Sequence, residues 1–204
     1  MVEDGVVEWL TALGYVASGL VALLMIKKRD FFTDQRVKKF FTVGCVAVGL
    51  AFLVVAGEEI SWGQRLVGFE TPEMIAAQNR QNEINLHNSE LIWPYVYTAY
   101  AAVGLYGMLM WLGRWLVKGL IKFNQQWQIW LKIIVPGPHL ILNFGLIVLY
   151  VWLRGHHGPW KYQLWEEYAE LLLVIGIIVH LLEVYVTFPK LLQRHSKSKG
   201  KSNR

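Results

Sequence analysis

The chain has little charge for its length, a single cysteine and only six prolines. Charged residues make up 17% of its 204 positions, whereas about 25% is usual in a soluble domain. That is too little charge to cover a water-facing globule of this size. Cys45 has no second cysteine to pair with, so a disulfide-stabilised scaffold is excluded. The 54% of apolar residues excludes a disordered chain. We therefore expect one integral membrane domain.

Five apolar stretches are long enough to cross a bilayer as helices, which requires roughly 20 mostly apolar residues each. We predict spans at residues 6–26, 41–57, 91–112, 133–153 and 168–188. Pro136 and Pro138 lie near the start of the fourth stretch, where they favour a kink or a late helix start. Pro189 is expected to end the fifth. The expected fold class is all-α, a polytopic transmembrane helix bundle, with residues 1–189 as a single domain.

The basic residues predict the orientation of this bundle, because cytoplasmic loops collect Lys and Arg. With the N-terminus outside, 16 of the 20 basic residues fall on the cytoplasmic side. The exceptions are Arg65, Arg80, Arg154 and Lys161. We therefore predict an N-out/C-in topology and no nucleic-acid partner. The sequence contains no Asn-x-Ser/Thr glycosylation acceptor, which is compatible with a bacterial inner (plasma) membrane.

Shorter segments complete the expected architecture. Thr71-Pro72-Glu73 has the pattern of a helix start, and we expect an outer loop helix to follow it. Residues 114–132 carry apolar side chains at helical spacing, as an amphipathic helix on the inner leaflet would. A continuation of the third spanning helix is the alternative there. Residues 190–204 are basic and poor in apolar side chains, so we expect a disordered cytoplasmic tail.

The acidic residues are concentrated on the outer side of this topology, which holds 12 of the 15. With one histidine, they form three groups at its boundary: Glu58 and Glu59, Glu83 and His87, and Glu166, Glu167 and Glu170. On the expected loop helix, Glu83 and His87 are four residues apart and share a face. Carboxylates at a membrane boundary require water, protons, paired bases or bound cations. We therefore expect a functional site.

Each group also has a structural interpretation. Glu58-Glu59 can mark a helix boundary, Glu83 and His87 can lie on a solvated loop helix, and the last three acids suit a helix N-terminus. Toward the inner side, three ionisable residues fall within predicted spans: His139, His180 and Glu183. They are compatible with a second site or proton path, or with structural pairing.

Two segments, GEEISWGQR (57–65) and EINLHN (83–88), resemble the signature of a family of small bacterial multi-pass membrane proteins. No activity is established for that family, so the resemblance implies no reaction. It does imply that the outer loop is the functional centre.

The leading functional hypothesis is an outward-facing membrane enzyme that hydrolyses or transfers a group of a lipid or lipid-linked substrate. The expected acid/base residues are Glu58, Glu59, Glu83 and His87. The head group would lie against Trp62, Gln64 and Arg65, with Arg65 on a phosphate. A divalent metal ion, if one assists, would have as ligands Glu59, Glu83, His87, Glu167 and Glu170. The alternatives are an ion-coupled transporter and a non-catalytic subunit of a membrane complex. The partners are membrane lipid and either a second copy of the chain or a complex subunit.

Overall fold

The computed structural model describes residues 5–120, 125–157 and 163–202. Side chains are described for all of these except Arg65 and residues 117–120, 125–128, 157, 163–164 and 189–202. Within this described part the chain is helical, and an isolated bridge pairs Asn79 with Ser89. The elements are α1 (Val6–Leu24), η1 (Met25–Phe31), α2 (Gln35–Glu59), η2 (Ser61–Gly63), α3 (Gln64–Val67), α4 (Glu73–Ala76), α5 (Trp93–Leu120), α6 (Gln125–Ile134), η3 (Pro138–Leu140), α7 (Ile141–His157) and α8 (Gln163–Ser202).

Within the described residues, five helical segments are long and apolar enough to cross a membrane. They are Val6–Phe31, Gln35–Glu59, Trp93–Leu116, Ile129–His156 and Trp165–Phe188. Each overlaps one of the five stretches predicted from hydropathy. The all-α multi-pass bundle is therefore confirmed.

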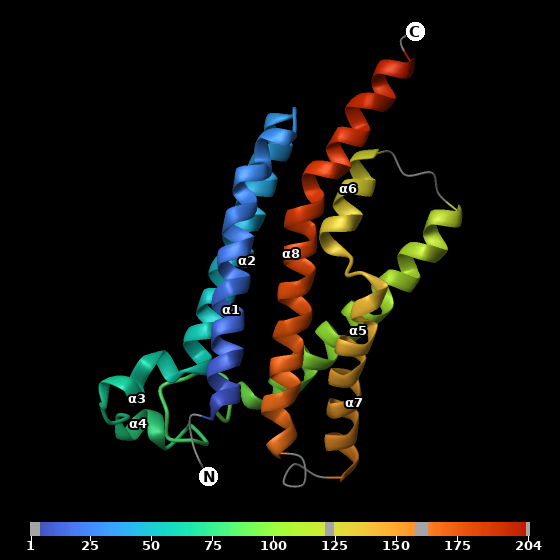
Figure 1. Ribbon diagram of the computed structural model, residues 1–204. Helices are drawn as coiled ribbons and strands as arrows, with labels where there is room; N and C mark the ends of the chain where they lie inside the picture. The colour runs from blue at the N-terminus through green and yellow to red at the C-terminus, as the bar shows by residue number, and fades with distance from the viewer. Residues whose placement is uncertain (1–4, 121–124, 158–162, 203–204) are drawn as a thin grey trace.

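The bundle consists of two helix pairs that meet on α8 (Figure 1). α1 packs against α2 and α8, and α7 packs against α5 and α8. The start of α1, α3, α4, the end of α7 and the start of α8 lie at one end, which we call the loop end (Figure 1). η1, α6 and the C-terminus lie at the opposite end, which we call the tail end (Figure 1).

The fourth span is broken, as its two prolines predicted. α6 ends at Ile134 and α7 begins at Ile141, with Pro136 and Pro138 in the interval. Proline removes helical hydrogen bonds, so carbonyls near the break need other donors. The Ile133 carbonyl accepts a hydrogen bond from His180 Nε2 at 2.8 Å, and the Ile134 carbonyl accepts one from the Tyr106 hydroxyl.

The other two inner ionisable residues also have a partner. His139 Nε2 lies 2.7 Å from Glu183 Oε1, so the pair joins the start of η3 to α8. Together with the bond from His180 to the broken span, this contact gives all three residues a structural role at the tail end.

The helices at the tail end differ from two expectations. Residues 114–132 do not form one amphipathic helix: α5 continues to Leu120, which was the alternative, and α6 is a separate helix that packs on α8. α8 continues past Pro189 to Ser202, where we predicted a stop and a disordered tail. The Lys, Leu, Gln and Arg residues after Pro189 have high helix propensity, and extending an existing helix costs less than starting one.

Gly107 permits the close approach of α5 to α7. A Cβ atom added at this position would lie 2.2 Å from the ring of Phe144, which is buried. Small residues at such contacts let helix backbones pack closely in membranes.

We therefore expect Gly107→Val to lower the free energy of unfolding by about 1–3 kcal/mol through overpacking. Gly113→Val on the same helix is the matched control, because a Cβ atom at Gly113 would meet nothing within 4 Å. Denaturant titration of the purified protein in detergent measures both. Equal losses in the two variants would contradict this packing.

Candidate functional site

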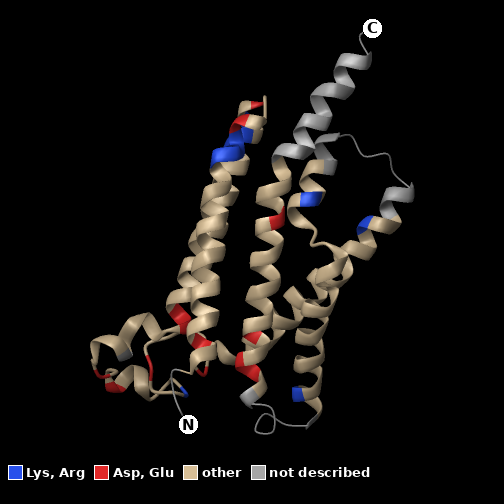
Figure 2. Ribbon diagram, in the orientation of Figure 1, with Lys and Arg blue, Asp and Glu red and all other residues tan. Residues whose placement is uncertain are grey.

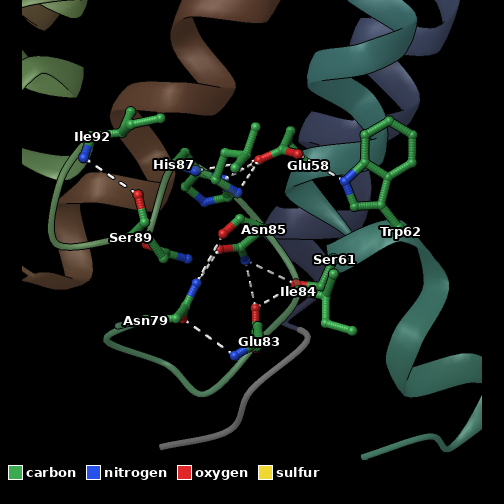
Figure 3. Close-up of polar contacts among 12 residues, drawn as sticks. Glu58, Ser61, Trp62, Asn79, Glu83, Ile84, Asn85, His87, Ser89 and Ile92 are labelled. Carbon is green, nitrogen blue, oxygen red and sulfur yellow. Dashed lines mark hydrogen bonds and ion pairs between the residues drawn. The ribbon is translucent and has the colours of Figure 1, made fainter. Parts of the chain in front are cut away.

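The chain leaves α2 through a left-handed turn. Ser61, Trp62 and Gly63 have φ values of 46°, 56° and 76°. A positive φ is strained for a residue as bulky as tryptophan, and such strain persists where surrounding contacts hold it. The indole of Trp62 folds back over α2, where its Nε1 donates to Glu58 Oε1 at 2.7 Å (Figure 3). A Cβ atom at Gly57 would lie 2.9 Å from this indole, so any larger residue at position 57 would require the indole to shift.

Glu58 joins α2 to residues 77–92, which we call the 77–92 loop. Its Oε2 accepts hydrogen bonds from the backbone N–H groups of Leu86 and His87, the second at 3.2 Å (Figure 3). The same oxygen lies 3.7 Å from Nδ1 of the His87 imidazole. That Nδ1 atom is buried and has no hydrogen-bond partner among the described residues. The side chains of Glu58 and His87 are therefore in contact but do not form a hydrogen bond.

Glu83 lies in a buried polar cluster that stabilises the same loop. Its carboxylate accepts hydrogen bonds from the Ser61 hydroxyl and from Asn85 Nδ2, the latter at 2.8 Å (Figure 3). Asn79 completes the cluster: its Nδ2 donates to Asn85 Oδ1 at 2.9 Å, and its Oδ1 accepts from the Glu83 backbone N–H at 3.2 Å. All four residues are buried. The hydrogen bonds of the Glu83 carboxylate therefore stabilise the fold of the loop.

Gln64 is also engaged by the fold. Its Oε1 accepts a hydrogen bond from the Ile84 backbone N–H at 2.8 Å, and its Nε2 donates to Thr71 Oγ1 at 2.6 Å. Thr71 Oγ1 in turn donates to the Asn82 carbonyl at 2.5 Å. The Gln64 side chain therefore holds α3 against Thr71 and against the 77–92 loop. The side chain of Arg65 lies outside the described residues.

The prediction that Glu83 and His87 share a helical face is wrong. α4 begins after Pro72, as expected, but it ends at Ala76. The 77–92 loop then runs through turns, with Asn82 at a φ of 56°. Asparagine side chains compete with a helix by bonding to nearby backbone groups, as Asn79 does here. The two residues lie at the same end through tertiary contacts instead.

Carboxylates from two spans meet beside this loop. Glu59 on α2 and Glu170 on α8 lie close enough to interact electrostatically, and Glu59 also interacts with His87. The hydroxyl of Tyr100 on α5 donates to Glu170 Oε1 at 2.5 Å. Most of the Asp and Glu positions coloured in Figure 2 lie at the loop end. Like charges repel strongly where water is scarce, so a cation or a shared proton is favoured between these carboxylates.

Two arginines and a row of aromatic rings border the same region. The Arg154 guanidinium lies 3.2 Å from Glu166 Oε2 and 3.4 Å from the centre of the Tyr97 ring. The Arg80 guanidinium lies 3.8 Å from the centre of the Trp93 ring. The sequence analysis did not assign these groups to the site. A signal was present, since Trp93, Tyr97 and Tyr100 recur at the i, i+4, i+7 spacing of one helix face.

The structure does not gather the five expected metal ligands into one shell. Among the described residues, no group of three or more His, Cys, Asp or Glu side chains is placed to hold a metal ion. Glu83 points to Ser61 and Asn85, and Glu167 lies near Gly5, where an added Cβ atom would be 3.6 Å from its Oε2. Of the five expected ligands, Glu59 interacts electrostatically with His87 and Glu170, and Glu170 also with Glu167.

No protein-family model, curated protein or solved structure matches the chain. The resemblance of segments 57–65 and 83–88 to a bacterial membrane protein family therefore stays a prediction. The geometry of the loop end is the basis for assigning a function.

Proposed function

We propose that the protein is a membrane enzyme that hydrolyses or transfers a group of a lipid or lipid-linked substrate, with His87 as general base. One observation carries this proposal: the buried Nδ1 atom of His87 has no hydrogen-bond partner among the described residues and lies 3.7 Å from Glu58. Buried polar atoms are rarely left unpaired, and catalytic groups are among the exceptions. Acid–base contacts are often long without substrate and tighten when it binds.

The other polar groups of the two signature segments support this choice by elimination. Ser61, Gln64 and Glu83 all have hydrogen bonds that hold the 77–92 loop. Among the described side chains of the two signature segments, Glu59 and His87 are the titratable ones that no such hydrogen bond of the loop employs. When Nδ1 turns to Glu58, Nε2 is the nitrogen that remains for proton transfer.

The proposed step is a balanced proton relay. His87 Nε2 accepts the proton of a water molecule or an acceptor hydroxyl while that oxygen forms a bond to a carbonyl carbon or a phosphorus atom. The same proton then passes to the leaving oxygen as its bond to that atom breaks. Glu58 orients the ring through Nδ1–H, and the negative charge of Glu58 stabilises the imidazolium that forms between the two transfers.

The position of the pair favours a lipid-derived substrate. The second span ends at Glu59, so the site lies at the boundary of the apolar region. The Arg80 backbone N–H donates to the Asn88 carbonyl at 3.1 Å, so an exposed arginine lies on the same loop as the base and next to the residue that follows it. Arginine binds phosphate through paired donors. We therefore assign Arg80, together with Arg65, to a phosphate of the head group, and the half-exposed Trp62 to its border.

If a divalent metal ion assists the reaction, Glu59 would be its ligand and not His87, because both nitrogens of the His87 ring are taken by Glu58 and by proton transfer. Elemental analysis of the purified protein tests for this metal, with Glu59→Gln as the variant and the exposed Glu73→Gln on α4 as the control. A stoichiometric metal lost in Glu59→Gln alone would support metal assistance. Metal-free protein that still turns over substrate would contradict it.

A product screen tests the proposed activity. The purified protein in mixed detergent–lipid micelles is incubated with phosphoglycerides, diacylglycerol and a polyprenyl-phosphate-linked sugar, and the products are identified by mass spectrometry. We expect products from the wild type and from His156→Ala, an exposed histidine on α7, but not from His87→Ala. Equal product from His87→Ala would refute the assigned base. No product from the wild type on any of these classes would refute the enzyme.

An ion-coupled carrier is the second candidate, and the broken fourth span favours it. Transporter sites are often built at breaks in spanning helices. At this break, His180 on α8 bonds to the Ile133 carbonyl. Glu170 lies on the same helix toward the loop end. Proton uptake by proteoliposomes under an imposed gradient, compared between the wild type and Glu170→Gln, tests this function. Absence of uptake by the wild type would exclude it.

We also propose that the loop end faces away from the cytoplasm of a bacterial cell. The distribution of Lys and Arg supports this orientation, because those of η1 and the start of α2 lie at the tail end (Figure 2). In a Cys45→Ser background, a membrane-impermeant maleimide added to intact cells should label Asn82→Cys but not Arg36→Cys. The reverse labelling would contradict the orientation.

A further inference from the structure

A basic hollow of about 480 Å³ lies at the tail end, on the opposite side of the bundle from the proposed active site. Its walls come from the last residues of η1 and the first turns of α2. The side chains that matter for binding are Arg29, Asp30, Lys38, Lys39, Thr42 and Val43. Small-molecule sites have volumes of about 300–1,000 Å³, so a head group fits within it.

The walls carry an excess of positive charge. Lys38 Nζ lies 3.2 Å from Asp30 Oδ1 and Arg29 Nε lies 3.9 Å from the same oxygen, so one carboxylate is shared by two cations. The ammonium group of Lys39 has no ion-pair partner among the described residues, and Lys39 is exposed. Three cationic groups therefore face one carboxylate. A ligand with a single net negative charge is favoured over a neutral one.

The hollow lies at the ends of two spans. This position favours a lipid over a soluble molecule as the source of the bound anion. Arg29 and Asp30 fall at the end of the first span, and Lys38 and Lys39 fall near the beginning of the second. Val43 in its wall is 58% exposed, and Phe40 on the same helix is 71% exposed. A soluble phosphate would leave these apolar surfaces unused, whereas a lipid would cover them with its acyl chains.

We propose that this hollow binds the head group of an anionic phospholipid. The phosphate contacts Lys38, Lys39 and Arg29, and the acyl chains follow Phe40 and Val43 along α2. Asp30 accepts a hydrogen bond from a head-group hydroxyl, which suits a glycerol head group. Basic pockets between transmembrane helices are known to bind such head groups.

Native mass spectrometry of the purified protein, titrated with phosphatidylglycerol or phosphatidylcholine, tests this proposal. We expect the wild type to retain phosphatidylglycerol more tightly. Each lost charge should weaken that binding about fivefold, so Lys38→Gln/Lys39→Gln should weaken it about 25-fold. The charge-conserving Lys38→Arg should retain wild-type binding. Arg36→Gln is the matched control for a single lysine substitution. It also removes one positive charge from α2, but Arg36 does not line the hollow.

Two outcomes would overturn the proposal. If Arg36→Gln weakens binding as much as Lys38→Gln or Lys39→Gln alone does, a diffuse surface charge attracts the lipid and the hollow does not. If soluble glycerol 3-phosphate displaces phosphatidylglycerol at equal concentration, the site recognises free phosphate. Neither outcome depends on the activity proposed for the loop end.

Discussion

Replacing His87 with alanine is expected to lower the turnover of the substrate by about 10²–10⁴-fold, the contribution typical of a general base. The expected loss is in kcat, because the imidazole acts on a proton in the transition state and does not anchor the head group. KM should change little. Steady-state kinetics on the substrate found in the product screen measure both quantities.

His156→Ala is the control for this variant, because it removes an exposed histidine from α7 and leaves the loop end unchanged. A loss of less than threefold in His87→Ala, or a change in KM alone, would show that His87 is not the base. Hydrogen–deuterium exchange of His87→Ala checks that the 77–92 loop of this variant remains folded.

Replacing Glu83 with alanine is expected to release the 77–92 loop while the five spans remain folded. The change leaves two buried donors, the Ser61 hydroxyl and Asn85 Nδ2, without their acceptor. Each unpaired buried group costs about 1–3 kcal/mol, so the local stability of the loop should fall by several kcal/mol. Hydrogen–deuterium exchange of loop peptides measures this local opening.

Glu73→Ala removes an exposed carboxylate from α4 and serves as the control. Glu83→Gln should have a smaller effect, since both bonds go to the single oxygen Oε2 and the amide oxygen of glutamine can take its place as an uncharged acceptor. Unchanged exchange of the loop in Glu83→Ala would contradict the structural role of Glu83. It would also restore Glu83 as a candidate for the acid/base chemistry that the sequence analysis assigned to it.

Hydropathy was sufficient to predict the spans, because each one depends on a long local run of apolar residues. The break in the fourth span was equally local, since Pro136 and Pro138 act on their own backbone. The length of the loop helix was not predictable in this way. Thr71-Pro72-Glu73 marks a helix start, but the hydrogen bonds of Asn79 that replace the helix connect it to Glu83 and Asn85.

The roles within the candidate site depended on contacts between distant residues. The signature segment pointed to Glu58, Glu59 and His87, yet it gave Gln64 and Glu83 the same weight. Only the tertiary contacts separate them, because Gln64 bonds to Ile84 and Thr71 whereas His87 Nδ1 has no hydrogen bond among the described residues. Left-handed turns of the kind found at Trp62 also have no sequence rule outside glycine and asparagine.

The central claim is that Glu58 acts through His87, and a double-mutant cycle on turnover tests it most directly. Gln at position 58 keeps an acceptor for the loop N–H groups but removes the negative charge beside Nδ1. We predict that Glu58→Gln lowers kcat at least tenfold in the wild-type background and has no further effect once His87 is Gln. Losses that multiply in the double variant would contradict the account, because the two residues would then act independently.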